Sequence, residues 1–162
     1  MLKLEQITKK FHIGTPDETT LFNQFCFEVQ KGEFVSIVGS NGSGKTTLLN
    51  IVCGSLPVEG GKVFFKDQDI TRMTEFKRAD KIGRVFQDPM TGTAATMQIE
   101  ENLALARRRG QPRTLRTGIT REEREEYKQL LKPLGLGLDE RLTAKVGLLS
   151  GGQRQALTLL MA

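Results

Sequence analysis

Eight consecutive residues at 39–46, Gly-Ser-Asn-Gly-Ser-Gly-Lys-Thr, constrain the fold of this chain more than any other feature. They match the pattern G-x-x-x-x-G-K-[ST], in which glycines let successive backbone amides turn inward around an anion. The pattern needs a strand before it and a helix after it. Residues 32–38 form an apolar, β-branched run that predicts a buried strand, and residues 46–53 have a helical pattern that ends at Gly54. The sequence therefore predicts a phosphate-binding loop for a nucleoside triphosphate.

The loop pattern assigns chemistry to individual side chains. The helix after the loop adds the positive end of its dipole to the amides that face the phosphates. Lys45 supplies a mobile positive charge for the β and γ phosphates, and Thr46 supplies a hydroxyl for Mg²⁺. The residues expected to bind the nucleotide here are Ser40, Asn41, Gly42, Ser43, Gly44, Lys45, Thr46 and Thr47.

Bulk composition limits the class of protein. With 162 residues, of which 38% are hydrophobic, the chain can form one domain with a real core. Cys26 and Cys53 stand far apart without metal or redox spacing, which indicates ordinary thiols in a reducing compartment. There is no signal peptide, and no apolar run approaches the length needed to cross a bilayer. We therefore expect a soluble, cytoplasmic chain.

Much of the net charge of +5 comes from one arginine-rich stretch. The stretch is either a solvated helix end and loop, or a docking surface for anionic lipid headgroups or an acidic partner. No aromatic residues interleave with the arginines, so we expect no nucleic-acid partner. Its members are Arg107, Arg108, Arg109, Arg113, Arg116, Arg121 and Arg124.

Apolar and polar residues alternate from Met1 to about Phe34, which predicts antiparallel strands with one buried face. Residues 62–66 and 81–86 predict two further strands. After residue 89 helix formers with periodic leucines take over. They predict helices over 100–109 and 121–131, the second opened by a capping box at Thr120–Glu123, with an exposed loop at 110–118 between them. We expect a core over 1–89 and a helical subdomain over 90–162.

A second motif, Leu149-Ser150-Gly151-Gly152-Gln153, precedes a good helix start. A serine and two glycines at a helix N-terminus present amides and a hydroxyl to an anion. Alone, the motif also fits a plain helix cap. Beside a complete phosphate loop, it points to the same class of ligand.

With these motifs in this order, the chain resembles the ATP-binding cassette (ABC) ATPase family. Residues 39–46 look like its Walker A loop, 149–153 like its signature, and Gln87, followed by Asp88-Pro89, like its Q-loop glutamine. Phe11 stands where the family carries an aromatic that stacks on adenine, although it also fits a core or edge-strand phenylalanine. The resemblance implies an α/β P-loop NTPase fold with an antiparallel β subdomain and an inserted α-helical subdomain, incomplete at the C-terminus.

The resemblance also implies a division of labour. ATP and Mg²⁺ are the expected cofactors, with Thr46 and Gln87 as metal ligands and Lys45 and Gln87 in catalysis. The signature residues of one chain contact ATP on a second ATPase subunit in a head-to-tail dimer. Residues 90–105 receive integral membrane permease subunits, which places the chain on the inner face of the plasma membrane. The signature set is Ser150, Gly151, Gly152 and Gln153.

The Walker B strand and the switch histidine of that family are not found in these 162 residues. Residues 134–140 end in Asp-Glu, but they precede the signature and alternate with glycines, so they do not qualify. We expect the N-terminal portion of a longer ATPase that powers a transporter, with small-solute import in a bacterium as the favoured role. The alternatives are a non-transport ABC ATPase of translation or DNA repair and, for the chain as given, an ATP-binding fragment that does not hydrolyse.

Overall fold

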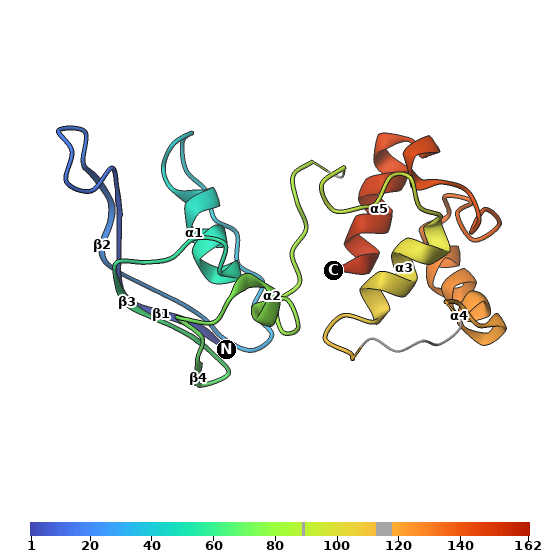
Figure 1. Ribbon diagram of the computed structural model, residues 1–162, viewed down its shortest axis with the longest axis horizontal. Helices are drawn as coiled ribbons and strands as arrows, with labels where there is room; N and C mark the ends of the chain where they lie inside the picture. Colours follow the sequence, from blue (N-terminus) through green and yellow to red (C-terminus); the bar gives the residue numbers. More distant parts are fainter. Residues whose placement is uncertain (89, 113–117) are drawn as a thin grey trace. The chain divides into compact units, whose positions relative to one another are not determined.

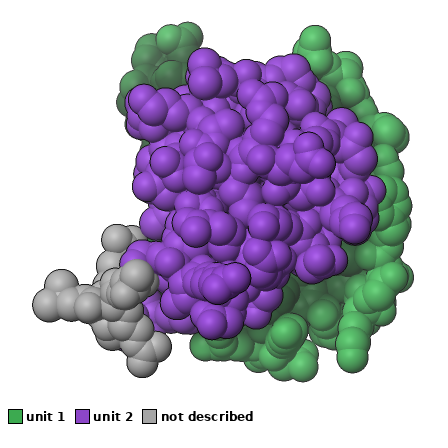
Figure 2. All heavy atoms as spheres, turned by 90° about the vertical axis from the view of Figure 1, so that its right-hand side faces the viewer, with its two compact units in different colours: residues 1–82 green, residues 83–162 purple. Residues whose placement is uncertain are grey.

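A computed structural model describes residues 1–88, 90–112 and 118–162. They form two compact units, residues 1–82 and 83–162, which are coloured separately in Figure 2. Pro89 and, from the arginine-rich stretch, Arg113 and Arg116 lie outside the described residues, as does most of the loop expected at 110–118. The domain boundary expected after residue 89 stays a prediction.

The first unit is built on an antiparallel sheet with the strand order β2-β1-β3-β4. Its strands are β1 (Leu2–Phe11), β2 (Thr19–Val29), β3 (Gly60–Phe65) and β4 (Gln68–Asp69). Helix α1 (Lys45–Cys53) lies against one face of this sheet (Figure 1). The alternation predicted for the N-terminal part is confirmed, because one face of the sheet and one face of α1 share a core. Its buried members are Leu4, Ile7, Leu48, Ile51, Val52, Val63 and Ile70.

The C-terminus of α1 is closed by a glycine and an arginine. Gly54 has φ 84°, a left-handed conformation that glycine adopts without strain, as its predicted role as the helix stop requires. The short helix α2 (Glu75–Arg78) carries Arg78, whose guanidinium Nη1 donates hydrogen bonds to Ile51 O at 2.7 Å and Val52 O at 2.9 Å. The last carbonyls of a helix lack the amide four residues further on, so Arg78 supplies donors to them, and Ile51 O also accepts from Gly54 N at 3.2 Å.

The second unit is helical, with α3 (Ile99–Arg107), α4 (Arg121–Leu131) and α5 (Gly151–Met161) around one core. Two single-turn helices, η1 (Lys132–Leu134) and η2 (Val146–Leu148), connect α4 to α5. The buried residues of this core are Ile99, Leu103, Ala104, Tyr127, Leu131, Leu138, Leu142, Val146, Leu149 and Leu157. Among the described residues, no helix combines the length and the apolar character that crossing a membrane requires.

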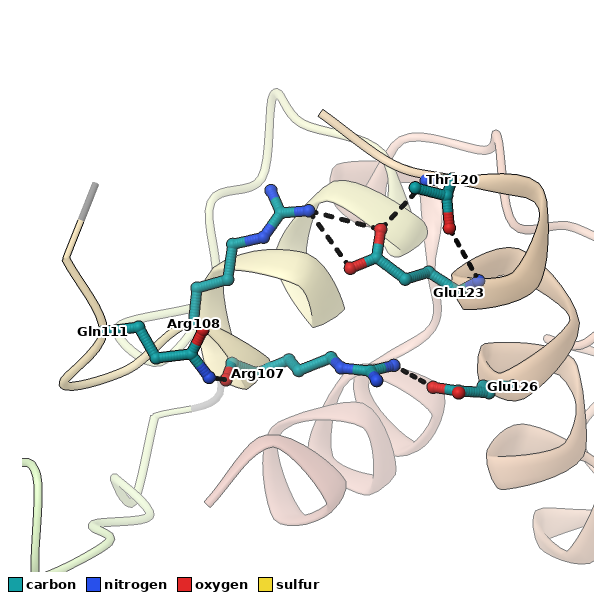
Figure 3. A network of polar contacts seen from close by, with 6 residues as sticks. All are labelled: Arg107, Arg108, Gln111, Thr120, Glu123 and Glu126. Carbon is teal, nitrogen blue, oxygen red and sulfur yellow. Dashed lines mark hydrogen bonds and ion pairs between the residues drawn. The ribbon is translucent and has the colours of Figure 1, made fainter. Parts of the chain in front are cut away.

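Arginines of the basic stretch bind groups within this unit. Figure 3 shows Arg107 paired with Glu126 and Arg108 paired with Glu123, two ion pairs that join the end of α3 to α4. The distance from Arg108 Nη2 to Glu123 Oε1 is 3.2 Å. Arg109 donates to Met161 O at 2.7 Å, at the end of α5. These contacts favour the interpretation of the stretch as a helix end over that of a docking surface.

The strands expected over 32–38 and 81–86 are wrong. Neither range has strand structure, and Phe34 and Val38 are 97% and 88% exposed. A strand exists through hydrogen bonds to a neighbouring strand, and within 1–88, 90–112 and 118–162 no segment pairs with either range. The burial expected for the run at 32–38 is wrong too, because an apolar pattern alone supplies neither a neighbouring strand nor a covering layer.

Candidate functional site

The loop at 39–44 has the backbone conformation that its glycines predict. Gly42 and Gly44 have φ 83° and 92°, in the left-handed region where a side chain is strained. Gly44 is also the residue that caps α1, and a Cβ at this position would lie 3.1 Å from the ring of Phe22 on β2. The loop therefore rests on the sheet through its last glycine, while residues 39–43 are exposed.

The α1 N-terminus is electrostatically suited to an anion. The first amides of a helix have no partner within the helix, and the first turn of α1 contains no acidic residue. Lys45 donates from Nζ to Gly39 O at 2.8 Å and to Ser40 O at 2.7 Å, so its ammonium is held over the same loop. Amides and a cation converge where the sequence predicts phosphates.

The remaining loop residues are accessible. Thr46 is exposed in the first turn of α1 and Thr47 is half-buried beside it. Ser43 donates its backbone amide to Ser40 O at 3.3 Å, which closes a turn through Asn41 and Gly42.

Phe11 is the last residue of β1 and lies opposite Thr19 of β2. Its ring is half-buried, and Lys9 Nζ lies 5.4 Å from the ring centroid. Phe11 and the loop thus belong to the same compact unit, the first. A half-buried aromatic ring at a strand end offers a face on which a base can stack.

Gln87 and residues 150–153 belong to the second unit. Gln87 is exposed in a bend of the chain, so its amide is accessible. Ser150 caps α5: its Oγ accepts from Gln153 N at 3.3 Å, and Gln153 Oε1 accepts from Ser150 N at 3.1 Å. The motif can therefore be a helix cap and an anion site at once, because the cap leaves the following amides of the first turn without partners within the helix.

Gly151 and Gly152 have no local steric reason to be glycine. Both are exposed, neither has a positive φ, and a Cβ added at either position meets no atom within 4 Å. The two glycines are the first two residues of α5, and without side chains they leave the backbone amides of its first turn accessible.

The metal predicted for the site is Mg²⁺. The described residues contain no cluster of three histidine, cysteine, aspartate or glutamate side chains that could hold a metal ion by itself. Mg²⁺ bound with nucleotides does not need such a cluster, because it keeps several waters and takes phosphate oxygens as ligands. The exposed hydroxyl of Thr46 and the amide oxygen of Gln87 fit that oxygen-ligand chemistry.

Sequence reasoning missed the groups that surround Phe11. Lys9 is only 5% exposed and binds Glu59, a residue 50 positions further along the chain. A lysine in the alternating pattern of a strand gives no signal for so distant a partner. An apolar position occupied by lysine on the buried face of β1 was the one sign available.

Comparison with known proteins gives consistent matches. A protein-family model described as ABC transporter matches residues 22–162. The tyrosine transport ATP-binding protein of Clostridioides difficile is 40% identical over 162 residues, which are 100% of this chain and 64% of that protein. The lipoprotein-releasing system ATP-binding protein LolD of Idiomarina loihiensis is 30% identical over 166 residues, covering 100% of this chain and 68% of LolD.

Solved structures agree with these relatives. The dimeric ATP-binding cassette MJ0796 bound to ADP and Pi has a TM-score of 0.79 and 29% identity, and the match covers 99% of this chain and 68% of that one. These structures confirm the α/β P-loop NTPase fold class predicted from the sequence. The chain thus spans about two thirds of the length of these proteins, and 64% of the tyrosine transport protein.

Proposed function

Because this chain belongs to the ABC transporter family, we propose that it is part of an ATP-binding subunit that couples ATP binding and hydrolysis to solute transport. One observation carries the proposal: the loop at 39–46 folds into a cradle in which left-handed glycines, the α1 N-terminus and the Lys45 ammonium converge. Such convergence stabilises a polyphosphate and has no evident structural use.

Each residue then has a defined role. Amides of residues 40–47 hold the phosphates, and Lys45 stabilises the negative charge on the transferred phosphoryl group. Thr46 and Gln87 supply oxygen ligands to Mg²⁺, and Gln87 senses the γ-phosphate. Phe11 stacks on adenine. When bound, Mg²⁺ neutralises charge on the phosphates.

The signature residues act on a second subunit. Gly151 and Gly152 leave the N-terminus of α5 open on its outer side, where a phosphate can approach the amides closely. We assign this surface, with Ser150 and Gln153, to the ATP of an opposing subunit in a head-to-tail dimer. The dimeric state of the MJ0796 cassette supports this assignment.

Membrane permease subunits are the proposed partners, and they place the protein at the cytoplasmic face of the membrane. Import of a small solute in a bacterium is the favoured role, with an amino acid such as tyrosine as the first candidate, because a tyrosine transport protein is 40% identical to this chain. A role in translation or DNA repair is not favoured, since relatives of this chain are named for tyrosine transport and for sulfate/thiosulfate import.

Binding of ATP with Mg²⁺ by calorimetry tests the nucleotide site. We expect Lys45→Ala to weaken ATP binding about tenfold to a hundredfold, because it removes charge-assisted hydrogen bonds to phosphate. The matched control is Lys62→Ala, an exposed lysine of the same unit, which should bind like the wild type. Equal affinities for ATP in wild type and Lys45→Ala would refute the site.

Transport needs a separate test. Affinity purification from the native membrane should recover permease subunits with the protein, and reconstituted vesicles should take up the solute only with ATP. Recovery of ribosomal or DNA-repair components instead would overturn the transport role while leaving the nucleotide site intact.

A further inference from the structure

A side chain replaces a strand neighbour at the end of β1. Strand β1 pairs with β3 as far as Thr8, which lies opposite Gly60, and Glu59 N donates to Thr8 O at 3.0 Å. Beyond Thr8 the Glu59 carboxylate, in place of a strand, provides the hydrogen-bond acceptor for β1: Glu59 Oε2 accepts from Lys10 N at 2.7 Å. The carboxylate thereby satisfies a backbone donor and fixes the residue immediately before Phe11.

The second carboxylate oxygen of Glu59 holds a buried cation. Lys9 Nζ donates to Glu59 Oε1 at 2.6 Å and to Pro57 O at 2.8 Å. The Lys9 side chain is almost completely enclosed, and lysine is buried in this way only when it is paired. Burial of Glu59 raises its pKa, but the hydrogen bonds from Lys9 and Lys10 outweigh burial and the net pKa is lowered. The carboxylate is therefore an ionised partner of the ammonium.

This ion pair lies on the side of the sheet that carries the phosphate loop. Lys9 is opposite Phe22, and side chains of directly opposite residues share one face of an antiparallel pair. Phe22 is also the residue against which Gly44 of the loop packs. Phe11 is two residues after Lys9 and so faces the same way, with its ring centroid 5.4 Å from Lys9 Nζ.

We infer that Glu59 is a positioning residue for the nucleotide base: it holds Lys9 against the Phe11 ring and fixes the backbone before Phe11, so that the ring presents one orientation to adenine. The inference rests on the proposed function, in which Phe11 stacks on adenine. The Lys9 ammonium is attracted to the π face of the ring. Without the Glu59 carboxylate, this cation is buried without a counter-ion and moves toward water, which removes the neighbour of the ring.

Two ligands separate the base from the phosphates in the test. Binding of ATP and of inorganic tripolyphosphate, each with Mg²⁺, is measured for wild type, Phe11→Ala, Glu59→Ala and the double variant. Phe11→Ala should lower the preference for ATP over tripolyphosphate about tenfold, the effect of one lost base stack. Glu59→Ala should lower the preference for ATP about threefold to tenfold, with the affinity for tripolyphosphate unchanged. In the double variant, Glu59→Ala should cause no further loss of preference beyond that of Phe11→Ala.

Two further variants guard against a trivial loss of structure. Glu59→Gln keeps the shape and one acceptor, so it should recover part of the preference, and it replaces Glu59→Ala if that variant does not fold. The control is Glu5→Ala, which removes the carboxylate of an exposed ion pair on β1, with Lys3 Nζ 2.6 Å from Glu5 Oε1. This variant should bind both ligands as the wild type does. Thermal unfolding of every variant is recorded in parallel.

The outcomes distinguish the inference from the proposed function. Glu59→Ala that keeps the wild-type preference, weakens both ligands equally, or adds to Phe11→Ala overturns the inference alone. A wild type that binds tripolyphosphate as tightly as ATP removes the proposed role of Phe11. A wild type that binds neither ligand removes the nucleotide site.

Discussion

The Arg124 guanidinium binds the Glu100 carboxylate through two hydrogen bonds, of 2.6 Å from Nε to Oε2 and 2.8 Å from Nη2 to Oε1. The pair joins α4 to the first turn of α3. Its two members differ in environment, because the Glu100 side chain is 4% exposed and that of Arg124 is 44% exposed. Removal of one partner therefore has a different consequence from removal of the other.

We predict that Arg124→Met lowers the thermal unfolding midpoint more than Glu100→Gln does. Loss of Arg124 leaves a buried carboxylate without a counter-ion, whereas loss of the Glu100 charge leaves an arginine that water can solvate. Circular dichroism melts check the order. The control is Lys128→Met, which breaks the exposed Lys128–Glu125 pair of 2.8 Å on α4 and should change the midpoint little. If Glu100→Gln lowered the unfolding midpoint more than Arg124→Met, the buried Glu100 carboxylate would not depend on Arg124 as its counter-ion.

Arg78 should be one of the most sensitive positions of the first unit. It is 3% exposed and its guanidinium donates to carbonyls of Met73, Thr71, Ile51 and Val52. We predict that Arg78→Met lowers the free energy of unfolding by about 3 kcal/mol, because the buried carbonyls lose charge-assisted bonds. Arg78→Lys should recover part of it, since an ammonium reaches fewer acceptors. Urea unfolding measures both, with the exposed Lys77→Met as the control that should stay unchanged.

Features that depend on neighbouring residues were predictable from the sequence. The left-handed glycines of the phosphate loop, the stop of α1 at Gly54, the capping box at Thr120 and the helix cap at Ser150 each need only a few adjacent residues, and all are present in the structure. The same holds for the alternation that predicts β1 and β2, because it reports one buried face directly.

Features that depend on distant partners were not predictable. The run at 32–38 has the composition of a strand, but composition cannot supply the neighbour with which it would pair, and its side chains are exposed. Arg78 and Ile51 are 27 positions apart, and Lys9 and Glu59 are 50 apart. Such contacts arise from how the sheet and α1 pack, so the pattern of adjacent residues in the sequence does not predict them.

The Glu123 carboxylate accepts hydrogen bonds from Arg108, at the end of α3, and from the Thr120 backbone amide, at the start of α4 (Figure 3). The Thr120 backbone amide lowers the pKa of Glu123 from its ordinary value of 4.5; burial opposes this, and Arg108 adds to it. Because the pKa is lower in the folded state, Glu123 stabilises the fold above its unfolded pKa and loses that effect as the pH falls through the folded value.

We therefore predict that Glu123→Gln is less stable than the wild type at neutral pH and that the difference disappears in acid. Urea unfolding between about pH 7 and about pH 3 measures the difference. The exposed Glu140→Gln controls for the change in net charge. A gap between wild type and Glu123→Gln that stays constant across this range would refute the linkage, and NMR titration of the Glu123 carboxyl group gives an independent reading of its pKa.

At Gly152, a substitution by alanine should have opposite effects on the stability of the fold and on ligand binding. Its backbone is helical, its surroundings are open, and alanine would fit without contact. We predict that Gly152→Ala raises the free energy of unfolding by about 0.4–1 kcal/mol, because the unfolded chain loses conformational freedom. The same variant should lose ATP-dependent dimerisation, since the added methyl group blocks close approach of a phosphate to the amides of α5.

Sedimentation with and without ATP, together with urea unfolding, tests both halves of this prediction. The control is Gln155→Ala, at an exposed position of the same helix, which should leave the proposed ATP-dependent dimerisation unchanged. If Gly152→Ala is destabilised, the glycine serves the fold of α5. If it is more stable and still dimerises, no partner phosphate reaches this helix end. Only gain of stability combined with loss of the dimer shows that the open N-terminus of α5 is kept free for the nucleotide of a second subunit.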